Sequence, residues 1–170
     1  MILQNRHGGK VIVRIIVEGC DGVGKTTLAK KLAEKYNIKS YMHITRDDPN
    51  TAEFYVNTLN KTDVIFDRHF IGEMIYPKIF GRHGNLTDAG FNFILNRARQ
   101  LGYRIFILYS DKETIKQRLK EDEHNEVIEN IEVINDRFIK LAMNYGIQLI
   151  NTSEDSFEFI CEAVEGFVGK

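Results

Sequence analysis

Residues 18–27 read EGCDGVGKTT and combine glycines with a lysine and two threonines, residue types suited to binding phosphate. Residues 19–26 match the G-x-x-x-x-G-K-[ST] phosphate loop at every fixed position. The glycines allow the backbone to bend so that consecutive N–H groups converge on a polyphosphate at a helix N-terminus. Lys25 supplies a positive charge for the β- and γ-phosphates, and the hydroxyl of Thr26 can ligate Mg²⁺. The expected nucleotide-binding residues of this loop are Gly19, Asp21, Gly22, Val23, Gly24, Lys25, Thr26 and Thr27.

The segments on either side of the loop fit the structure that such a loop needs. Residues 11–17 (VIVRIIV) are an almost unbroken run of β-branched apolar side chains, which is typical of a buried parallel strand. Residues 27–36 (TLAKKLAEKY) place apolar side chains at helical spacing, with charged residues on the other side. The order of strand, glycine loop and helix favours a phosphate site over a chance glycine-rich turn.

Further along the chain, apolar segments alternate with helical patterns. Strands are expected at residues 40–45, 63–67, 103–109 and 147–151. Helices are expected at residues 51–59, 72–80, 89–101, 112–121, 126–145 and 157–167. This alternation predicts an α/β fold with a five-stranded parallel sheet wrapped by helices, the three-layer fold of P-loop nucleoside triphosphate hydrolases, with ligands at the carboxyl ends of the strands. The chain shows no repeats or linkers, which indicates one domain over residues 1–170, with residues 1–9 as a loose leader.

The composition is that of an ordinary globular protein, and it narrows the classes of partner. The 170 residues carry a formal net charge of −1, which argues against a broad surface for duplex nucleic acid or an anionic membrane. No apolar run reaches the length of a membrane span. Cys20 and Cys161 form no C-x-x-C pair, which fits a reducing compartment. We expect a cytoplasmic protein that acts on a small molecule, as a monomer or a homodimer.

Charged side chains follow two of the predicted strands, at the edge where the phosphate loop is expected. Asp67 ends the strand at residues 63–67, where its carboxylate can hold Mg²⁺ through water, and the guanidinium of Arg68 can fork onto a phosphate. Arg46 follows the strand at residues 40–45 and is expected at the same edge. The structural alternatives are a helix-capping role for Asp67 and a surface position for Arg68.

Three aspartates near these residues each have two possible roles. Asp21 sets a negative charge beside a site built for phosphates, so it either faces a sugar hydroxyl or a water, or bonds to its own backbone in a turn. Asp47 and Asp48 either accept hydrogen bonds from a base or sugar, or shape the turn before Pro49.

Residues later in the chain extend the candidate site. Arg82 lies in a polar connection from which it could reach an incoming phosphate, because phosphoryl transfer spreads negative charge over oxygens. The candidates for a closing lid are Arg118, Lys120, Arg97 and Arg99. The aromatic residues that could stack on a base, or simply pack in the core, are Phe54, Tyr55, Phe70 and Tyr76. Cys20 is near a helix N-terminus, which can lower a thiol pKa, but a small packed residue is the simpler interpretation.

Four segments taken together resemble, in order and spacing, the thymidylate kinase family: EGCDGVGKTT, HITRDDPNT, VIFDRHF and LINTSED. The phosphate loop of that family has the form E-G-x-D-G-x-G-K-[ST]-T, with aspartate at the place of Asp21. Its second strand is followed by T-R-E-P, which residues 45–48 match loosely, with Pro49 one residue late. Its third strand ends in D-R-[YH], matched by residues 67–69, and residues 151–153 fall where the family has a loop beside the adenine of ATP.

The resemblance implies transfer of the γ-phosphate of ATP to a deoxynucleoside monophosphate. By that resemblance Lys25 and Thr26 would serve ATP and Mg²⁺, and Asp67 would support the metal. Arg68 and Arg46 would hold the acceptor phosphate. The remaining candidates are Asn151 beside the adenine, Arg118 as the nearest equivalent of a lid arginine, and Asp47, Tyr76 and Arg82 on the substrate side.

The chain also departs from the family. The segment between Arg46 and Asp67, where the family has a long helix that recognises thymine, is strongly abbreviated. The run after Asp67 (RHFIGEMIYPKIFGR) lacks the family's serine-containing continuation, and the lid between Arg118 and Glu126 is brief and acidic. The kinase interpretation survives these departures, whereas specificity for thymidylate does not. Compact kinases of this type, including viral ones, can phosphorylate other deoxynucleotides.

Three other functions compete with this interpretation. A deoxynucleoside kinase needs a carboxylate to receive the proton of its acceptor hydroxyl, and Asp47 or Asp48 could serve, although the arginines on the acceptor side favour a monophosphate. A GTP-binding switch is suggested by the N-K-x-D of residues 60–63, but this motif precedes the third strand, and no D-x-x-G follows Asp67. A polynucleotide kinase is disfavoured by the balanced charge.

Overall fold

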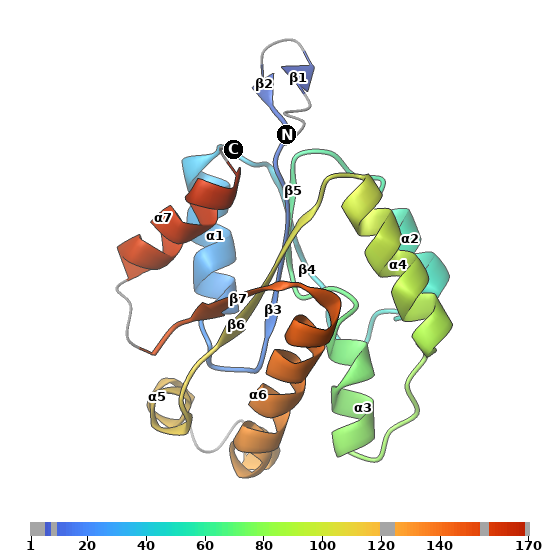
Figure 1. Ribbon diagram of the computed structural model, residues 1–170, viewed down its shortest axis with the longest axis vertical. Coiled ribbons are helices and arrows are strands. Elements are labelled where there is room, and N and C mark those ends of the chain that lie inside the picture. The colour runs from blue at the N-terminus through green and yellow to red at the C-terminus, as the bar shows by residue number, and fades with distance from the viewer. Residues whose placement is uncertain (1–5, 8–9, 120–124, 154–156, 169–170) are drawn as a thin grey trace.

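The computed structural model describes residues 6–7, 10–119, 125–153 and 157–168. Within them, five strands form one sheet in the order β4-β5-β3-β6-β7, and all neighbouring strands are parallel. The strands are β3 (Arg14–Gly19), β4 (Ser40–His43), β5 (Val64–Asp67), β6 (Arg104–Tyr109) and β7 (Gln148–Asn151). The predicted five-stranded parallel sheet is therefore confirmed (Figure 1).

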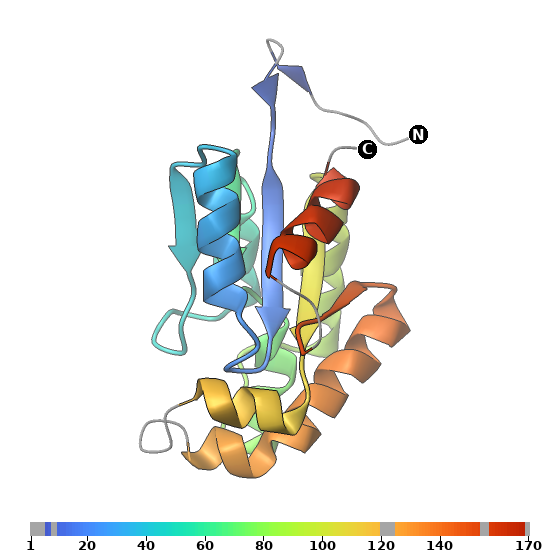
Figure 2. The ribbon, with the colours of Figure 1, turned by 90° about the vertical axis from the view of Figure 1, so that its left-hand side faces the viewer.

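Helices cover both faces of the sheet, which completes the three predicted layers (Figures 1 and 2). One face carries α1 (Lys25–Lys35) and α7 (Phe157–Val168). The other face carries α2 (Ala52–Thr58), α4 (Asp88–Gln100) and α6 (Asn125–Tyr145). The short helices η1 (Gly72–Met74), α3 (Tyr76–Ile79) and α5 (Lys112–Arg118) lie toward the carboxyl ends of the strands. Because the strands are parallel, these ends share one edge with the loop that joins β3 to α1.

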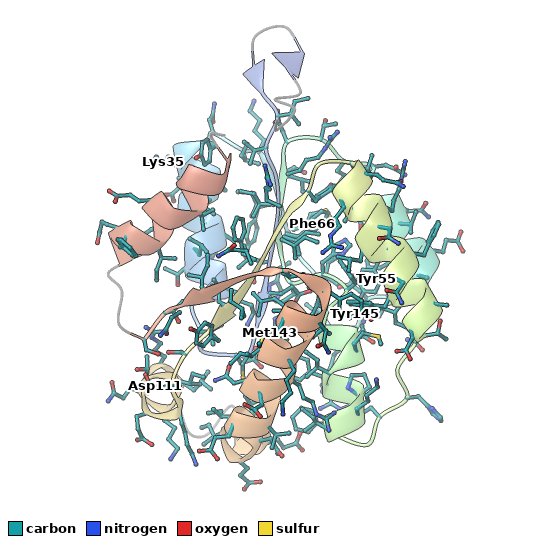
Figure 3. The ribbon with its side chains drawn as sticks, in the orientation of Figure 1. Lys35, Tyr55, Phe66, Asp111, Met143 and Tyr145 are labelled. Atoms are coloured by element: carbon teal, nitrogen blue, oxygen red, sulfur yellow. The ribbon has the colours of Figure 1, made fainter. Side chains whose placement is uncertain are left out.

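The core is built from the same apolar runs that predicted the strands. Ile15 and Val17 in β3 have no exposed surface, because β3 is the central strand and helices cover both of its faces. On the side of α2, the side chains of Tyr55 and Phe66 point into the interior (Figure 3). The ring of His69 packs 4.9 Å from that of Tyr55 and 4.6 Å from that of Phe66, centroid to centroid. The turn that follows β5 is thereby anchored in the core.

The start of the chain differs from the prediction. The strand expected at residues 11–17 begins at Arg14. Lys10–Val11 forms β2, which pairs antiparallel with β1 (Arg6–His7) in a separate two-stranded sheet. The leader expected to be loose therefore contains a short strand, and its other residues lie outside the described part of the chain.

The helix expected at residues 72–80 is divided into η1 and α3. Pro77 has no backbone N–H, so it cannot donate to the carbonyl group four residues earlier, and a continuous helix through this segment is disfavoured. The helix expected at residues 112–121 ends at Arg118, and its last two expected residues lie outside the described part of the chain.

Gly19, at the end of β3, allows the loop to leave the sheet at this point. Its φ of +136° is a conformation that side-chain-bearing residues rarely adopt. A Cβ atom here would lie 2.2 Å from the carbonyl oxygen of Leu108 in β6, which is a severe overlap with backbone. The first glycine of the loop is therefore required by the packing of β3 against β6 as well as by the bend.

Replacing Gly19 by alanine should lower the free energy of unfolding by about 3 kcal/mol or more, because a strained φ adds to the backbone overlap. Gly146→Ala is the matched control, since Gly146 has a φ of +60° but nothing within 4 Å of its Cβ position. We expect a loss of about 1–2 kcal/mol for the control. Urea unfolding followed by circular dichroism measures both values, and equal losses would contradict the packing argument.

Candidate functional site

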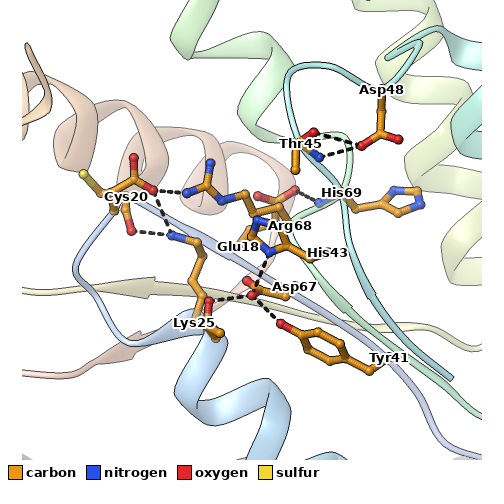
Figure 4. A network of polar contacts seen from close by, with 12 residues as sticks. Glu18, Cys20, Lys25, Tyr41, His43, Thr45, Asp48, Asp67, Arg68 and His69 are labelled. Carbon is orange, nitrogen blue, oxygen red and sulfur yellow. Dashed lines mark hydrogen bonds and ion pairs between the residues drawn. The ribbon is translucent and has the colours of Figure 1, made fainter. Parts of the chain in front are cut away.

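The loop between β3 and α1 surrounds the amine of Lys25. Lys25 Nζ donates a hydrogen bond to the carbonyl oxygen of Cys20 at 2.6 Å and lies 3.6 Å from Asp21 Oδ1 (Figure 4). The Lys25 side chain is only 4% exposed. Burial is the main effect that lowers the pKa of Lys25 from its ordinary value, and the positive charge of Arg68 lowers it further. An ammonium group in this position would be stabilised by an anion that enters the loop.

The hydroxyl of Thr26 joins the loop to the neighbouring strand. Thr26 Oγ1 donates a hydrogen bond to Asp67 Oδ2 at 2.5 Å. The same carboxylate oxygen accepts a hydrogen bond from the hydroxyl of Tyr41 at 2.8 Å and lies 2.9 Å from His43 Nδ1 (Figure 4). The structure therefore brings together the two residues predicted to hold a metal, Thr26 from the first turn of α1 and Asp67 from the end of β5.

The environment of Asp67 keeps its carboxylate ionised. Burial alone would raise the pKa of Asp67, but the hydrogen bonds from Thr26, Tyr41 and His43 outweigh it and lower the pKa. The second oxygen, Oδ1, is buried and has no hydrogen-bond partner among the described residues. Since Thr26 gives its proton to Asp67, the lone pairs of the Thr26 hydroxyl are available to a cation.

The Thr26 hydroxyl and the Asp67 carboxylate fit a Mg²⁺ ion that also binds water and phosphate. They fit less well a metal whose ligands all come from the protein. Within the described ranges, no group of three or more His, Cys, Asp or Glu residues could hold a metal ion. Mg²⁺ commonly takes one or two protein oxygens and completes its shell with water and substrate phosphates. Thr26 and Asp67 are placed to supply such a partial set of ligands beside the phosphate loop.

Arg68, which was predicted to bind a phosphate, is paired with a residue of the phosphate loop in this structure. Arg68 Nη2 donates to Asp21 Oδ1, so the guanidinium is paired with the phosphate loop (Figure 4). This contact also answers the question left open for Asp21, whose carboxylate pairs with Arg68 and lies near Lys25. Arg68 Nε is buried and has no partner among the described residues. Arg68 thus keeps donors that an additional acceptor could use.

Glu18 holds the turn that presents Arg68. It is 1% exposed, and its Oε1 accepts hydrogen bonds from the backbone N–H groups of His69 at 2.8 Å and Ile71 at 2.9 Å. These bonds stabilise a turn in which Arg68 adopts a φ of +68°, which is uncommon for a residue other than glycine. Glu18 was not among the predicted site residues, and its signal was an acidic residue directly after a buried apolar run.

His69, the last residue of the D-R-H match, is a core residue. His69 Nε2 lies 2.8 Å from Thr58 Oγ1, and burial lowers the pKa of His69 to about 3, so its ring is neutral at physiological pH. The Thr58 hydroxyl donates its proton to the carbonyl oxygen of Tyr55, so His69 Nε2 must be the donor in their contact.

A cavity of about 720 Å³ opens beside the loop, and every residue predicted to bind the substrate lines it. These residues are Arg46, Asp47, Arg68, Tyr76 and Arg82. Gly19 and Asp21 of the phosphate loop also line the cavity, so a ligand in it would lie next to a phosphate in the loop. The phosphate loop and the candidate substrate cavity are therefore adjacent.

The turn after β4 forms the open rim of this cavity. The side chains of Arg46 and Asp47 are 78% and 88% exposed and approach one another to 3.8 Å. Asp48 Oδ2 instead accepts a hydrogen bond from the backbone N–H of Thr45 at 2.7 Å. Of the two interpretations left open for Asp48, the structure supports the one in which it shapes the turn.

Aromatic residues and Arg82 form another wall. The rings of Tyr76 and Phe80 are stacked, with centroids 6.1 Å apart and planes at 11°. The Arg82 guanidinium lies 4.8 Å from the centroid of Phe80, and Arg82 Nη2 lies 3.7 Å from Glu126 Oε2 on α6. Phe70, which was a candidate for base stacking, has no exposed surface and packs in the core.

Among the described lid candidates, Arg118 lies at the phosphate loop, whereas Arg97 and Arg99 both lie in the last turn of α4. Arg118 donates to the carbonyl oxygen of Thr152 at 2.7 Å and to that of Gly22 at 3.4 Å, so it lies across the phosphate loop. Asn151 Oδ1, in the segment predicted beside an adenine, accepts from the backbone N–H of Ser153 and shapes the turn. The prediction for Arg99 is wrong, because Arg99 donates to the Tyr145 carbonyl before the start of β7, at the opposite edge of the sheet. Lys120 lies outside the described residues.

Two other sequence features have structural explanations. Asp63, the last residue of the N-K-x-D match, accepts a hydrogen bond from the backbone N–H of Val13 at 3.0 Å, at the amino ends of the strands. The motif therefore lies away from the phosphate loop. Cys20 is fully buried, and burial raises the pKa of its thiol to about 12, which is opposite to the lowered pKa considered for this position.

Comparisons with known proteins agree with the geometry. The chain matches the family described as nSTAND3, novel STAND NTPase 3, over residues 13–148. It is also 24% identical to a probable thymidylate kinase from Methanocaldococcus jannaschii, over 182 residues that cover 91% of this chain and 94% of that protein. The predicted resemblance to thymidylate kinases is confirmed.

Solved structures show the same fold. The YorR protein of Bacillus subtilis, solved in complex with phosphorylated GDP, has a TM-score of 0.78 and 21% identity and covers 92% of this chain and 96% of its own. A deoxyadenosine kinase from M. mycoides with bound dATP has a TM-score of 0.62 and 16% identity and covers 93% and 100%. Among the described helices, none has both the length and the apolar character needed to span a membrane.

The raised pKa of Cys20 leads to a prediction about its reactivity. A thiol that is buried and protonated should not react with Ellman's reagent at pH 8 in the native protein, because the thiolate is the reactive form. Cys20→Ser should therefore leave the native thiol titration unchanged while removing one thiol after denaturation. Rapid native labelling of Cys20, located by peptide mass spectrometry, would contradict the buried position.

Proposed function

We propose that this chain, which belongs to the nSTAND3 family, novel STAND NTPase 3, binds ATP with Mg²⁺ and transfers the γ-phosphate to a deoxynucleoside monophosphate. One observation carries this proposal. Thr26 and Asp67 are hydrogen-bonded beside the buried amine of Lys25, and the same loop lines a cavity of about 720 Å³ with room for an acceptor. The likeness to a probable thymidylate kinase supports transfer to a nucleotide rather than to water.

On the donor side, this chain's residues would bind and orient the triphosphate. Lys25 would exchange its contact with the Cys20 carbonyl for phosphate oxygens, which form stronger, charge-assisted hydrogen bonds. Thr26 and Asp67 would hold Mg²⁺, which when bound neutralises the charge that develops on the β- and γ-phosphates. Arg118, already across the loop at Gly22, would cover the donor nucleotide near Thr152.

On the acceptor side, Arg68 would bind the phosphate of the monophosphate. It lines the cavity, and it is held at the loop by its ion pair with Asp21. A second anion next to the guanidinium would share its five N–H donors with Asp21. Arg46 and Arg82, which line the same cavity, would add positive charge as the acceptor enters. Three arginines around one cavity suit an acceptor that is itself charged.

A nucleoside with a free hydroxyl is the second candidate acceptor, because the fold is shared with a deoxyadenosine kinase. Such an acceptor needs a carboxylate that can receive a proton. Asp48 is hydrogen-bonded to Thr45, Asp67 accepts from three donors, and Asp47 is 88% exposed at the rim. Neither Asp47 nor Asp48, the two bases expected for such an acceptor, is poised inside the cavity, so the three arginines favour the monophosphate.

The proposal predicts that Mg-ATP drives phosphorylation of deoxynucleoside monophosphates with kcat/KM values at least about tenfold above those for deoxynucleosides. The reason is that only the charged acceptor gains the charge-assisted bonds of the arginines. A coupled assay of ADP release across the four monophosphates and the four nucleosides measures this ratio. Parallel assays with GTP as donor test the nucleotide suggested by the YorR complex.

The control for this assay is Lys25→Ala, which removes a charge from the loop and should reduce turnover by about a hundredfold or more. Its thermal unfolding should remain cooperative, so that loss of activity is separated from loss of fold. Faster turnover of nucleosides than of monophosphates would replace the proposed acceptor with a hydroxyl. Turnover of neither class would refute the kinase assignment.

A further inference from the structure

Most polar side chains of the acceptor cavity already have partners within the protein. Asn50 is an example, because its Nδ2 donates to the Thr45 carbonyl and its Oδ1 accepts from the Tyr55 hydroxyl. Glu18 is occupied by two backbone N–H groups, and Arg68 is paired with Asp21. These groups shape the cavity, and they leave little capacity to recognise the base of a ligand.

Glu73 is different, because it is a half-buried carboxylate that lines the cavity with few partners. It lies in η1, just after the turn that presents Arg68. Its carboxylate accepts from the backbone N–H of Asn85 and feels the charge of Arg82. An ionised carboxylate can accept about four hydrogen bonds, so the contacts made by the described residues leave most of its capacity open. Burial raises the pKa of Glu73, as expected for a carboxylate away from bulk water.

The residues beside Glu73 form a surface suited to a flat ligand. Tyr76, two residues after the end of η1, lines the cavity with Phe80, and the two rings are nearly parallel. The Tyr76 hydroxyl is buried and has no hydrogen-bond partner among the described residues. A carboxylate and an aromatic wall on one short stretch of chain provide both polar and apolar contacts for a planar base.

We propose that Glu73 recognises the base of the acceptor and selects bases that carry an exocyclic amino group, namely adenine, cytosine and guanine, over thymine. This inference rests on the proposed function for the position of the acceptor, with its phosphate at Arg68 and its base beyond η1. The carboxylate accepts a hydrogen bond from the amino group, as glutamate and aspartate do from the N4 amino group of cytosine.

Thymine lacks this donor at the corresponding edge. It presents carbonyl oxygens on either side of a single N–H group, so a carboxylate that meets its edge faces at least one oxygen that carries partial negative charge. A site built around a half-buried acceptor disfavours a ligand that leaves the acceptor unpaired. The carboxylate would therefore turn a thymidylate kinase-like cavity towards other deoxynucleotides.

The test compares the wild-type protein with Glu73→Gln, which keeps the shape of the side chain but adds an N–H donor. The matched control is Glu53→Gln on α2, an exposed glutamate that does not line the cavity. The readouts are kcat/KM for dAMP, dCMP, dGMP and dTMP with Mg-ATP, and calorimetric binding of the same four monophosphates and their nucleosides without ATP.

We expect the wild type to prefer at least one amino-bearing monophosphate over dTMP by about tenfold or more, the effect of one charged hydrogen bond. Glu73→Gln should lower that preference by about tenfold and leave or raise the value for dTMP, whereas Glu53→Gln should change neither. A wild-type preference for dTMP, or an equal change for all four bases in Glu73→Gln, would overturn the role of Glu73. If no acceptor is phosphorylated, the proposed function fails, and the calorimetric binding preferences alone test the role of Glu73. Equal binding of thymine ligands and amino-bearing ligands would then overturn that role.

Discussion

The hydrogen bond between Thr26 and Asp67 joins the first turn of α1 to the end of β5, and the geometry of the candidate site depends on it. It fixes the phosphate loop against the neighbouring strand, so that the amine of Lys25 and the carboxylate of Asp67 face the same space. Tyr41 and His43 add two further contacts to the same carboxylate oxygen. Three hydrogen-bond partners restrict rotation of the carboxylate, which would preorganise the proposed site for a cation and a triphosphate.

A second constraint sets the acceptor side. The buried carboxylate of Glu18 holds the backbone after β5, and this turn places Arg68 beside the loop and continues into η1. The proposed recognition of the acceptor phosphate by Arg68 and of the base by Glu73 therefore depends on one short segment. The likeness to probable thymidylate kinases covers most of the chain, but this segment departs from the thymidylate kinase pattern. A family can in this way keep its donor site while its acceptor site diverges.

Local patterns made the fold and the phosphate loop predictable. The glycines, Lys25 and Thr26 are adjacent in sequence, and the strands are short apolar runs between helical patterns. The contacts of Asp67 with Tyr41 and His43 were not predicted, because they depend on the register that places His43 opposite Asp67 on neighbouring strands. The same holds for Asp21 and Arg68, which are 47 residues apart. Sequence patterns locate residues along the chain, whereas such pairs are decided by how the strands align.

The central claim is that the loop and Asp67 together form a magnesium-dependent site for a nucleoside triphosphate. Calorimetric titration of ATP, with Mg²⁺ or with a chelator, into the wild type and Asp67→Asn tests it most directly. We expect Mg²⁺ to tighten ATP binding at least about tenfold in the wild type, and to have a much smaller effect in Asp67→Asn, which lacks the charge that supports the metal. Absence of ATP binding by the folded wild type, or an equal effect of Mg²⁺ in both proteins, would contradict the account.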